Sequence, residues 1–212
     1  FSLFREFLAW IVEADKQFVI IGNINCVTYK EVFPLLRDNK VWMGCTIHSG
    51  DREFGVPDEY PLEAAGCRID ENGKKYIRVK GVRWYTNIDH GCRHNPLSLM
   101  SMADNIKYSK HKDIQGKKYQ HYDNYDAIEI PYTDAIPCDY ENLMGVPVTF
   151  LDKYCPEQFD IIWQACGNTR ASAPKEILDE VGYTIHPEDR GGCGVVNNKR
   201  QYARILIRKK HL

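Results

Sequence analysis

Apolar positions near the start of the chain recur at the spacing of an amphipathic helix. The positions that share one face of this helix are Leu3, Phe7, Leu8, Ile11 and Val12. Residues 17–22 follow as a continuous apolar run, which is typical of a strand buried on both faces in a parallel sheet. A second helix is expected over residues 29–36, with Thr28 as candidate N-cap and Pro34 as a candidate kink. This alternation of helix and strand predicts an α/β fold.

Two further strand regions are expected in the first half of the chain, over residues 41–47 and 75–88. The second region alternates polar and apolar side chains, and Gly81 divides it into two strands. Residues 48–74 are rich in glycine, proline and charge, and are interpreted as an insertion. Because this connection contains no evident helix, residues 41–47 and 82–88 are expected to form antiparallel neighbours.

The pattern changes in the middle of the chain. Residues 105–121 contain five lysines and two histidines but one acid, and few apolar residues, so residues 97–121 are interpreted as a basic, mobile linker. The linker would separate a first domain, residues 1–96, from a second domain, residues 122–212. In the second domain a helix and four short strands are expected, over residues 174–181 and near residues 127–130, 146–151, 161–163 and 202–208.

Composition narrows the class of protein. Hydrophobic residues make up 43% and charged residues 27% of the 212 residues, as in ordinary globular proteins, and the net charge is −1. Any nucleic-acid surface must therefore come from local clusters of basic residues. No apolar run approaches the ~20 residues that span a bilayer, so no membrane partner is expected. The eight cysteines form no C-x-x-C pair, which favours free, buried thiols and a cytoplasmic location.

Several stretches together resemble the EcoRI-type adenine-specific DNA methyltransferases, and they cover most of the chain. They are residues 1–7, 19–25, 83–90, 122–130 and 144–154, of which the last two are the most specific. The resemblance implies the C-terminal half of a Rossmann-like, S-adenosylmethionine-dependent methyltransferase sheet, followed by an α+β target-recognition region over residues 122–212. Residues 18–22 would form the fifth strand of that sheet, and residues 41–47 and 82–88 its terminal antiparallel pair.

The resemblance also implies a reaction. The intact enzyme would transfer a methyl group from S-adenosylmethionine to adenine N6 in a specific site of double-stranded DNA, as in restriction–modification, without a metal. The adenine must first leave the base stack. In this family the opening helix follows an Asn/Asp-Pro-Pro-Phe motif, so Phe1 would be the aromatic residue that stacks on the flipped base.

Asn23 and Asn25 follow the predicted strand at its carboxyl end, where open α/β sheets bind ligands. They are candidates for the adenine pocket, and an Asn-rich turn that only satisfies backbone groups is an equally good interpretation. The family's glycine-rich cofactor loop lies upstream of the matched residues. The chain is therefore expected to be a fragment that is inactive without the front half of the same enzyme. A non-catalytic, sequence-specific DNA-binding module is the alternative.

Basic residues supply candidate contacts to DNA phosphates. The candidates are Arg83, Arg93, Lys107, Lys110, Lys112, Lys117, Lys118, Lys199, Arg200 and Arg204. Asn197 and Asn198 are further candidates for reading adenine edges. A solvated loop is the alternative for the lysine-rich run, and ion pairing is the alternative for Arg83, Arg93 and His94.

His90, Cys92 and His94 offer three soft metal ligands within five residues. A zinc site needs a fourth ligand and a paired spacing that the sequence does not supply. A cysteine nucleophile at Cys92 beside a histidine is a further, less favoured interpretation. No metal site is therefore predicted.

Overall fold

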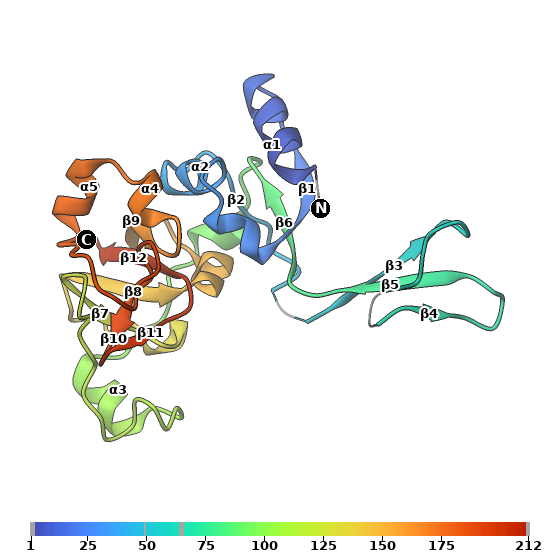
Figure 1. The fold of residues 1–212 in the computed structure, drawn as a ribbon. Helices are drawn as coiled ribbons and strands as arrows, with labels where there is room; N and C mark the ends of the chain where they lie inside the picture. The colour runs from blue at the N-terminus through green and yellow to red at the C-terminus, as the bar shows by residue number, and fades with distance from the viewer. Residues whose placement is uncertain (1–2, 49, 64–65, 211–212) are drawn as a thin grey trace.

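The computed structural model describes residues 3–48, 50–63 and 66–210 and shows a mixed α/β protein (Figure 1). The first part begins with helix α1 (Phe4–Glu13), strand β1 (Val19–Asn23), the 3-10 helix η1 (Ile24–Thr28) and helix α2 (Phe33–Arg37). Its sheet has the order β1-β6-β2, where β2 is Trp42–Met43 and β6 is Val82–Thr86. Both pairings are antiparallel, which confirms the predicted antiparallel pair.

The surroundings of β1 differ from the prediction. Within the described residues β1 lies at the edge of its sheet and pairs with β6 alone, in the antiparallel sense. Val19 is 54% exposed, so the strand is not buried on both faces here. An apolar run indicates that a strand packs against other elements, but it does not show which elements these are. Tertiary structure decides that. Within the described residues β1 therefore has neither the parallel neighbour nor the second covering layer that the sequence predicts.

Helix α2 begins later than the predicted helix. It starts at Phe33 with Pro34 in its first turn, where a missing backbone N–H leaves no hydrogen bond unmade. Thr28 does not cap it, because the Thr28 hydroxyl donates to the carbonyl of Asn25 within η1 (3.0 Å). Proline thus marks the start of this helix rather than a kink inside it.

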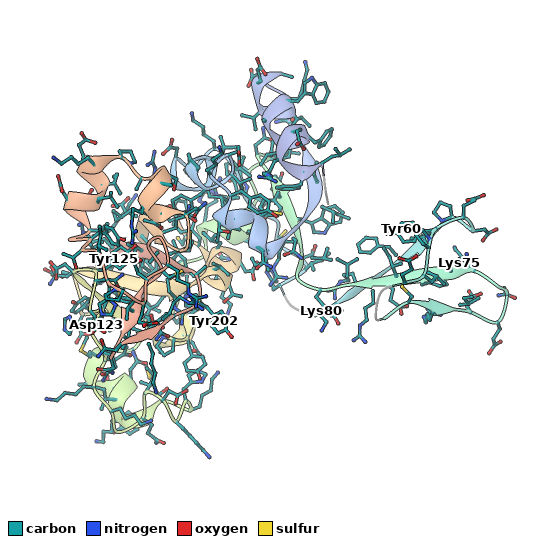
Figure 2. The ribbon with its side chains drawn as sticks, viewed as in Figure 1. Tyr60, Lys75, Lys80, Asp123, Tyr125 and Tyr202 are labelled. Carbon is teal, nitrogen blue, oxygen red and sulfur yellow. The ribbon has the colours of Figure 1, made fainter. Side chains whose placement is uncertain are left out.

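The segment between β2 and β6 forms a sheet of its own. Its strands are β3 (Arg52–Val56), β4 (Arg68–Ile69) and β5 (Lys75–Val79), in the antiparallel order β3-β5-β4. We call this sheet the arm, because it extends away from the rest of the molecule (Figure 1). Gly81, at a φ of +65°, separates β5 from β6, which confirms the predicted division at this glycine. Tyr60 and Lys75 lie on the arm, and Lys80 lies at its base (Figure 2).

The second half of the chain is built on a mixed four-stranded sheet of order β7-β8-β12-β9, in which β7 and β8 are parallel and the other pairs antiparallel. Its strands are β7 (Ala127–Glu129), β8 (Leu143–Pro147), β9 (Phe159–Ala165) and β12 (Arg204–Lys209). The remaining elements are η2 (Gly91–His94), α3 (Met102–Tyr108), η3 (Thr133–Ala135), η4 (Val148–Lys153), α4 (Thr169–Ser172), α5 (Lys175–Glu180), β10 (Val195–Val196) and β11 (Lys199–Arg200).

Most sequence expectations for this half are confirmed. Helix α5 lies between Pro174 and Gly182, and Gly182 takes the left-handed conformation (φ +60°) that ends many helices. The strand expected over residues 146–151 is wrong beyond Pro147, because residues 148–153 form the 3-10 helix η4. No helix in the described ranges is long and apolar enough to cross a membrane.

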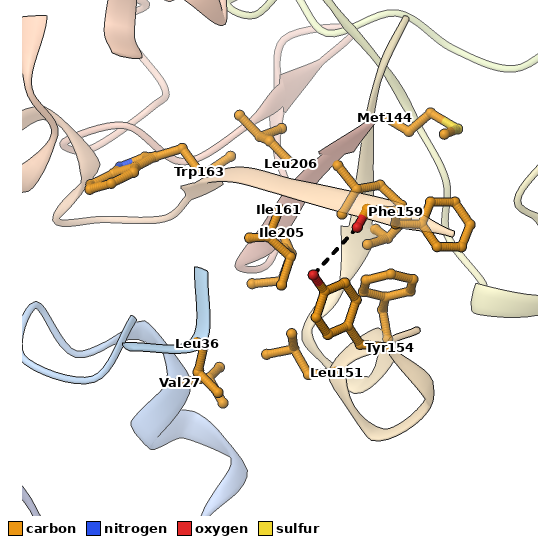
Figure 3. Close-up of a cluster of buried hydrophobic side chains, with 14 of the residues drawn as sticks. Val27, Leu36, Met144, Leu151, Tyr154, Phe159, Ile161, Trp163, Ile205 and Leu206 are labelled. Carbon is orange, nitrogen blue, oxygen red and sulfur yellow. Dashed lines mark hydrogen bonds between the residues drawn. The ribbon is translucent and has the colours of Figure 1, made fainter. Parts of the chain in front are cut away.

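The hydrophobic core is continuous between the β1-β6-β2 sheet and the β7-β8-β12-β9 sheet. Leu36 from the first half and Leu151, Trp163 and Ile205 from the second belong to one buried cluster (Figure 3). The Phe33 ring meets the Trp163 ring edge-on, with 5.3 Å between their centroids, so α2 packs directly on β9. Because the two halves share one core, a substitution at their junction should lower the stability of both halves.

Residues 97–121 are folded onto the second half, which corrects their interpretation as a mobile linker. They contain α3, whose first turn is capped by the Ser101 hydroxyl accepting from the backbone N–H of Asp104 (3.0 Å). Ile114 and Tyr119 are buried, and the Tyr119 hydroxyl donates to the carbonyl of Ala135 (2.6 Å). Buried apolar residues and hydrogen bonds such as that of His111 to Asp134 (2.8 Å) hold this lysine-rich stretch against the second half.

Candidate nucleic-acid interface

The first turn of α1 packs against the carboxyl end of β1. The rings of Phe4 and Tyr85 lie 4.8 Å apart and close over Gly22, where a Cβ atom would come within 2.7 Å of both. The Tyr85 hydroxyl also donates to the carbonyl of Asn23 (2.8 Å). The start of the helix is thus fixed beside the end of the strand. Phe1 lies outside the described residues, and its stacking role stays a prediction.

Asn23 and Asn25 lie at this end of β1 with different surroundings. The Asn23 amide accepts from the backbone N–H of Asn25 (2.9 Å) and donates to the carbonyl of Lys80 (2.7 Å). Asn23 therefore closes a turn, as one of the two interpretations expected. Asn25 is exposed, and within the described ranges no hydrogen bond engages its side-chain amide. Asn25 is the better placed of the two to meet a ligand.

Arg83 is not available to DNA, which corrects its assignment as a phosphate contact. Arg83 is 4% exposed, and its guanidinium donates to the Asp152 carboxylate from Nε (2.7 Å) and Nη2 (3.0 Å). Burial raises the pKa of Asp152, and the facing guanidinium acts in the opposite direction. The pair joins β6 to η4, so Arg83 ties the first sheet to the second half of the molecule. The sequence did not show that Arg83 would pair with the buried carboxylate of Asp152.

Arg93 and Arg204 are corrected for the same reason. Arg93 is 7% exposed, lies 3.5 Å over the Trp42 ring and faces Asp89 at 3.5 Å. Arg204 holds Glu129 through Nε (2.9 Å) and Nη2 (2.6 Å) in a partly buried bidentate pair. Arg93 is thus an ion-pair partner, which was the alternative interpretation of this residue. Arg204 is a structural residue of the β7-β8-β12-β9 sheet.

His94 is separated from the other soft ligands of its segment. Its two ring nitrogens meet Asp89 (2.9 Å) and Glu157 (2.8 Å), and these hydrogen bonds raise the pKa of His94. Asp89 is the larger cause and Glu157 the next. His94 therefore belongs to an ion-pair triad at the surface, as the ion-pair alternative expected.

Seven of the predicted basic contacts are exposed, and they come from two segments far apart in the chain. They are Lys107, Lys110, Lys112, Lys117 and Lys118 in the first segment and Lys199 and Arg200 in the second. Lys110 pairs with Asp134 (2.8 Å) and Lys117 with Asp113 (3.9 Å). No ion pair within the described residues neutralises the other five. Unpaired, solvated cations are the groups that a phosphate backbone attracts.

The tertiary structure brings the ends of these two segments together. Strands β10 and β11 form a hairpin whose turn, Asn197 and Asn198, has positive φ at both residues (50° and 58°). The Asn197 amide donates to Gln120 (3.1 Å), and the Asn198 backbone N–H donates to Asp123 (2.8 Å). We call Lys117, Lys118, Lys199 and Arg200 the basic edge, since these contacts place their segments side by side. Figure 2 labels Asp123 and the 88% exposed Tyr202 in this region.

The Asn-Asn turn was the signal in the sequence that could have predicted this hairpin. Two asparagines between the pairs Val195–Val196 and Lys199–Arg200 match the two-residue turn that asparagine favours, because asparagine tolerates positive φ. No local pattern in the chain indicated that this turn contacts Gln120 and Asp123.

A buried carboxylate anchors the loop that leads into the hairpin. Asp189 is 1% exposed and accepts hydrogen bonds from the hydroxyl of Tyr183 (2.6 Å) and Nη2 of Arg170 (2.6 Å). Burial alone would raise the pKa of Asp189. The hydrogen bonds from Tyr183, from the backbone of His186 and Gly191, and from Arg170 outweigh burial and lower the pKa to about 2.

Replacing Asp189 by asparagine should destabilise the protein in a pH-dependent way. A carboxyl whose pKa falls from its ordinary ~3.9 to about 2 on folding contributes roughly 2.5 kcal/mol at neutral pH. Because the folded pKa is the lower one, this contribution is present above pH ~4 and is lost as the pH falls through about 2. Urea unfolding of the wild type and the D189N variant at pH 7 and pH 3 checks this. An equal difference at both pH values would contradict it.

The cavity beside α1 is not suited to S-adenosylmethionine. This cavity has a volume of about 1150 Å³, lies between α1, β1 and the arm, and is lined mainly by apolar side chains, with Glu6 as its one acidic residue. The amino-acid end of this cofactor is charged and its ribose hydroxyls need polar partners, so the cavity does not fit it.

Comparisons with known proteins match this chain to one family over almost its whole length. The family model described as adenine-specific methyltransferase EcoRI matches residues 1–210. The chain is 41% identical over 212 residues to the type II methyltransferase M.EcoRI of Escherichia coli, and 31% identical over 215 residues to M.MgeORF184P of Mycoplasma genitalium. It is 28% identical over 213 residues to M.MpnI of Mycoplasma pneumoniae.

These alignments include 99–100% of this chain but 56%, 63% and 62% of the three relatives, so the chain spans little more than half of their length. No solved structure matches the chain significantly. The family match over nearly all residues settles the assignment that the sequence motifs suggested. The chain belongs to the EcoRI-type family of adenine-specific methyltransferases.

Proposed function

We propose that this chain is part of a DNA methyltransferase that transfers a methyl group from S-adenosylmethionine to adenine N6 in a specific double-stranded site. The observation that carries the proposal is the family match over residues 1–210. The names of three relatives as type II methyltransferases support a role in restriction–modification.

In this proposal the chain supplies the back of the catalytic domain, residues 1–96, and a target-recognition domain, residues 122–212, joined by the basic segment 97–121. The order β1-β6-β2, with β6 antiparallel to both neighbours, supports a Rossmann-like terminal pair beside a fifth strand. S-adenosylmethionine would be bound mainly by the part of the relatives' length that this chain does not span. The chain alone would then be inactive.

The adenine would be held where α1 starts beside the end of β1. Phe1 directly precedes the segment that Phe4 fixes over Gly22, and Asn25 is exposed at the same strand end. An aromatic ring stacks on a flipped base with ~1–3 kcal/mol, and an amide matches the adenine edge. Phe1 would stack on the flipped adenine, and Asn25 would orient it.

The double helix would be bound by the basic edge and the adjoining lysines. A two-stranded β ribbon fits the major groove, and the β10–β11 hairpin carries Asn197 and Asn198 at its tip. In this arrangement Lys118 and Arg200 bind phosphates, which fixes the register, and the Asn198 side chain reads bases, since the Asn197 amide is held by Gln120. Lys107 and Lys112 would extend the phosphate contacts.

Substituting Lys118 and Arg200 together by alanine should weaken DNA binding without sequence preference. Each lost phosphate contact lowers the slope of log affinity against log salt by about 0.9, so the double variant should lose about 1.8. Fluorescence anisotropy with duplex DNA over a salt series measures the slope. Lys30, an exposed lysine beside α2, is the matched control, and its alanine variant should keep the slope. An unchanged slope in the double variant would contradict the proposed interface.

The reaction itself is tested on the full-length protein that contains this chain. Labelled S-adenosylmethionine and duplex DNA are incubated with it, and the DNA is digested to nucleosides for mass spectrometry. Label in N6-methyl-2′-deoxyadenosine is the expected result, and label in a methylated deoxycytidine would overturn the adenine assignment. DNA binding without any methyl transfer would favour the alternative, a non-catalytic DNA-binding module.

A further inference from the structure

Cys45, His90 and Cys92 meet at one point, although Cys45 is distant from the other two in the sequence. One ligand atom from each residue, the two Sγ atoms and a ring nitrogen, lies within 4.8 Å of the others. All eight cysteines are free, but Cys45 and Cys92 are exposed rather than buried as the sequence suggested.

The orientation of His90 leaves a ring nitrogen free for a ligand. Nε2 lies 2.8 Å from the carbonyl of Met43, and because a carbonyl can only accept, Nε2 of the neutral ring carries the hydrogen. Nδ1 therefore has an unshared lone pair. Nδ1 is also buried without any hydrogen-bond partner in the described structure. A buried acceptor without a hydrogen bond lowers stability by ~1–3 kcal/mol, so a ligand on Nδ1 would remove this cost.

Metal-binding histidines have this arrangement, with the second ring nitrogen donating to a backbone carbonyl that fixes the ring. We propose that Cys45, His90 and Cys92 bind a zinc ion through two thiolates and Nδ1 of His90. Binding releases the two thiol protons to solvent, and no electrons are transferred. The two thiolates neutralise the charge of the divalent ion.

The geometry is close to that of a zinc site. Zinc bonds of about 2.3 Å to sulfur and 2.0–2.1 Å to nitrogen in a tetrahedron separate the ligand atoms by about 3.5–3.8 Å. The observed limit of 4.8 Å requires side-chain adjustments of about 1 Å or less. Thiolate and imidazole ligands select zinc over magnesium or calcium, which prefer oxygen.

Three protein ligands leave the fourth position open. No fourth histidine, cysteine or carboxylate in the described ranges joins the cluster, and His94 is held by Asp89 and Glu157 instead. Cys45 and Cys92 both line a cavity of about 310 Å³ that a water ligand can enter. The site would tie the loop after β2 to η2, beside the junction that Arg83 and Asp152 hold.

The proposal is tested by metal binding to the purified, reduced chain. Zinc content is measured after dialysis, and cobalt(II) is titrated as a spectroscopic substitute. One equivalent of metal is expected, together with the visible bands of tetrahedral cobalt and a sulfur-to-cobalt charge-transfer band. C45S, C92S and H90A should each lose tight binding, whereas C138S and H94Q should retain it. Absence of stoichiometric metal, or retention of the cobalt bands in C92S, would overturn the proposal.

A second measurement needs no variant. The alkylation rate of each cysteine in the wild-type chain is followed by peptide mass spectrometry with and without zinc. Zinc should slow the alkylation of Cys45 and Cys92 and leave Cys67 unchanged. Equal rates with and without zinc would contradict the site. A Cys45–Cys92 disulfide that persists in the reduced preparation and blocks zinc uptake would equally overturn it, and would assign the pair a redox role instead.

Discussion

Replacing Arg83 by alanine is expected to lower the free energy of unfolding by about 3–5 kcal/mol. The change removes one member of a bidentate pair in which both side chains are almost fully buried, at 5% and 4% side-chain exposure. Asp152 would then be a buried charge without a partner, and its desolvation would no longer be offset. Denaturant unfolding monitored by circular dichroism measures the loss as a lower midpoint.

Two controls separate the burial of this pair from the mere presence of an ion pair. Arg78 pairs with Asp51 on the arm at 2.8 Å, but Arg78 is largely exposed, so R78A should cost about 0–1 kcal/mol. The double variant R83M/D152L replaces the pair by apolar side chains and should recover most of the loss. If R83A costs no more than R78A, water reaches Asp152 and the pair is not a structural tie.

Replacing Arg204 by alanine should destabilise the second sheet by a similar amount, about 3–5 kcal/mol. Glu129 lies on β7 and Arg204 on β12, on opposite sides of β8, so their bidentate pair bridges the sheet. The buried Tyr122 hydroxyl also donates to Glu129. The ring of Tyr122 is confined by Gly145 and Gly194, where any Cβ would overlap it, so it cannot move to compensate.

Arg208 on the same strand is the matched control. It pairs with Glu180 at 3.2 Å, and both side chains are about 40% exposed, so R208A should cost about 0–1 kcal/mol. Thermal unfolding of the two variants measures the difference. A stable R204A variant with weakened DNA binding would reverse the interpretation and restore Arg204 as a DNA contact.

Local sequence pattern predicted much of the secondary structure. The apolar period of residues 3–12 corresponds to α1, the run at 17–22 largely to β1, and Gly81 to the break between two strands. These features follow from side-chain spacing and backbone preference, which act over a few residues. Segments with weak periodicity were missed: α3 lies in a lysine-rich stretch, and β3 and β4 of the arm lie in residues that were interpreted only as an insertion.

Charge was a poorer guide than pattern, because the sequence does not say where a charged side chain points. Arg83, Arg93 and Arg204 look like Lys118 and Arg200 in the sequence, yet the first three are buried or partly buried and paired with Asp152, Asp89 and Glu129. A salt bridge between residues 69 positions apart depends on the packing of β6 against η4. Only that packing distinguishes a structural arginine from one that is free to meet DNA.

By itself, the sequence determined the family, the mixed α/β class and the approximate positions of most helices and strands, since these depend on local spacing and on motifs that survive in order along the chain. The tertiary structure decided which residues meet. It placed the Asn197–Asn198 turn against Gln120 and Asp123, and it brought Cys45 to Cys92. Long-range packing sets such contacts, and no local pattern in the chain encodes them.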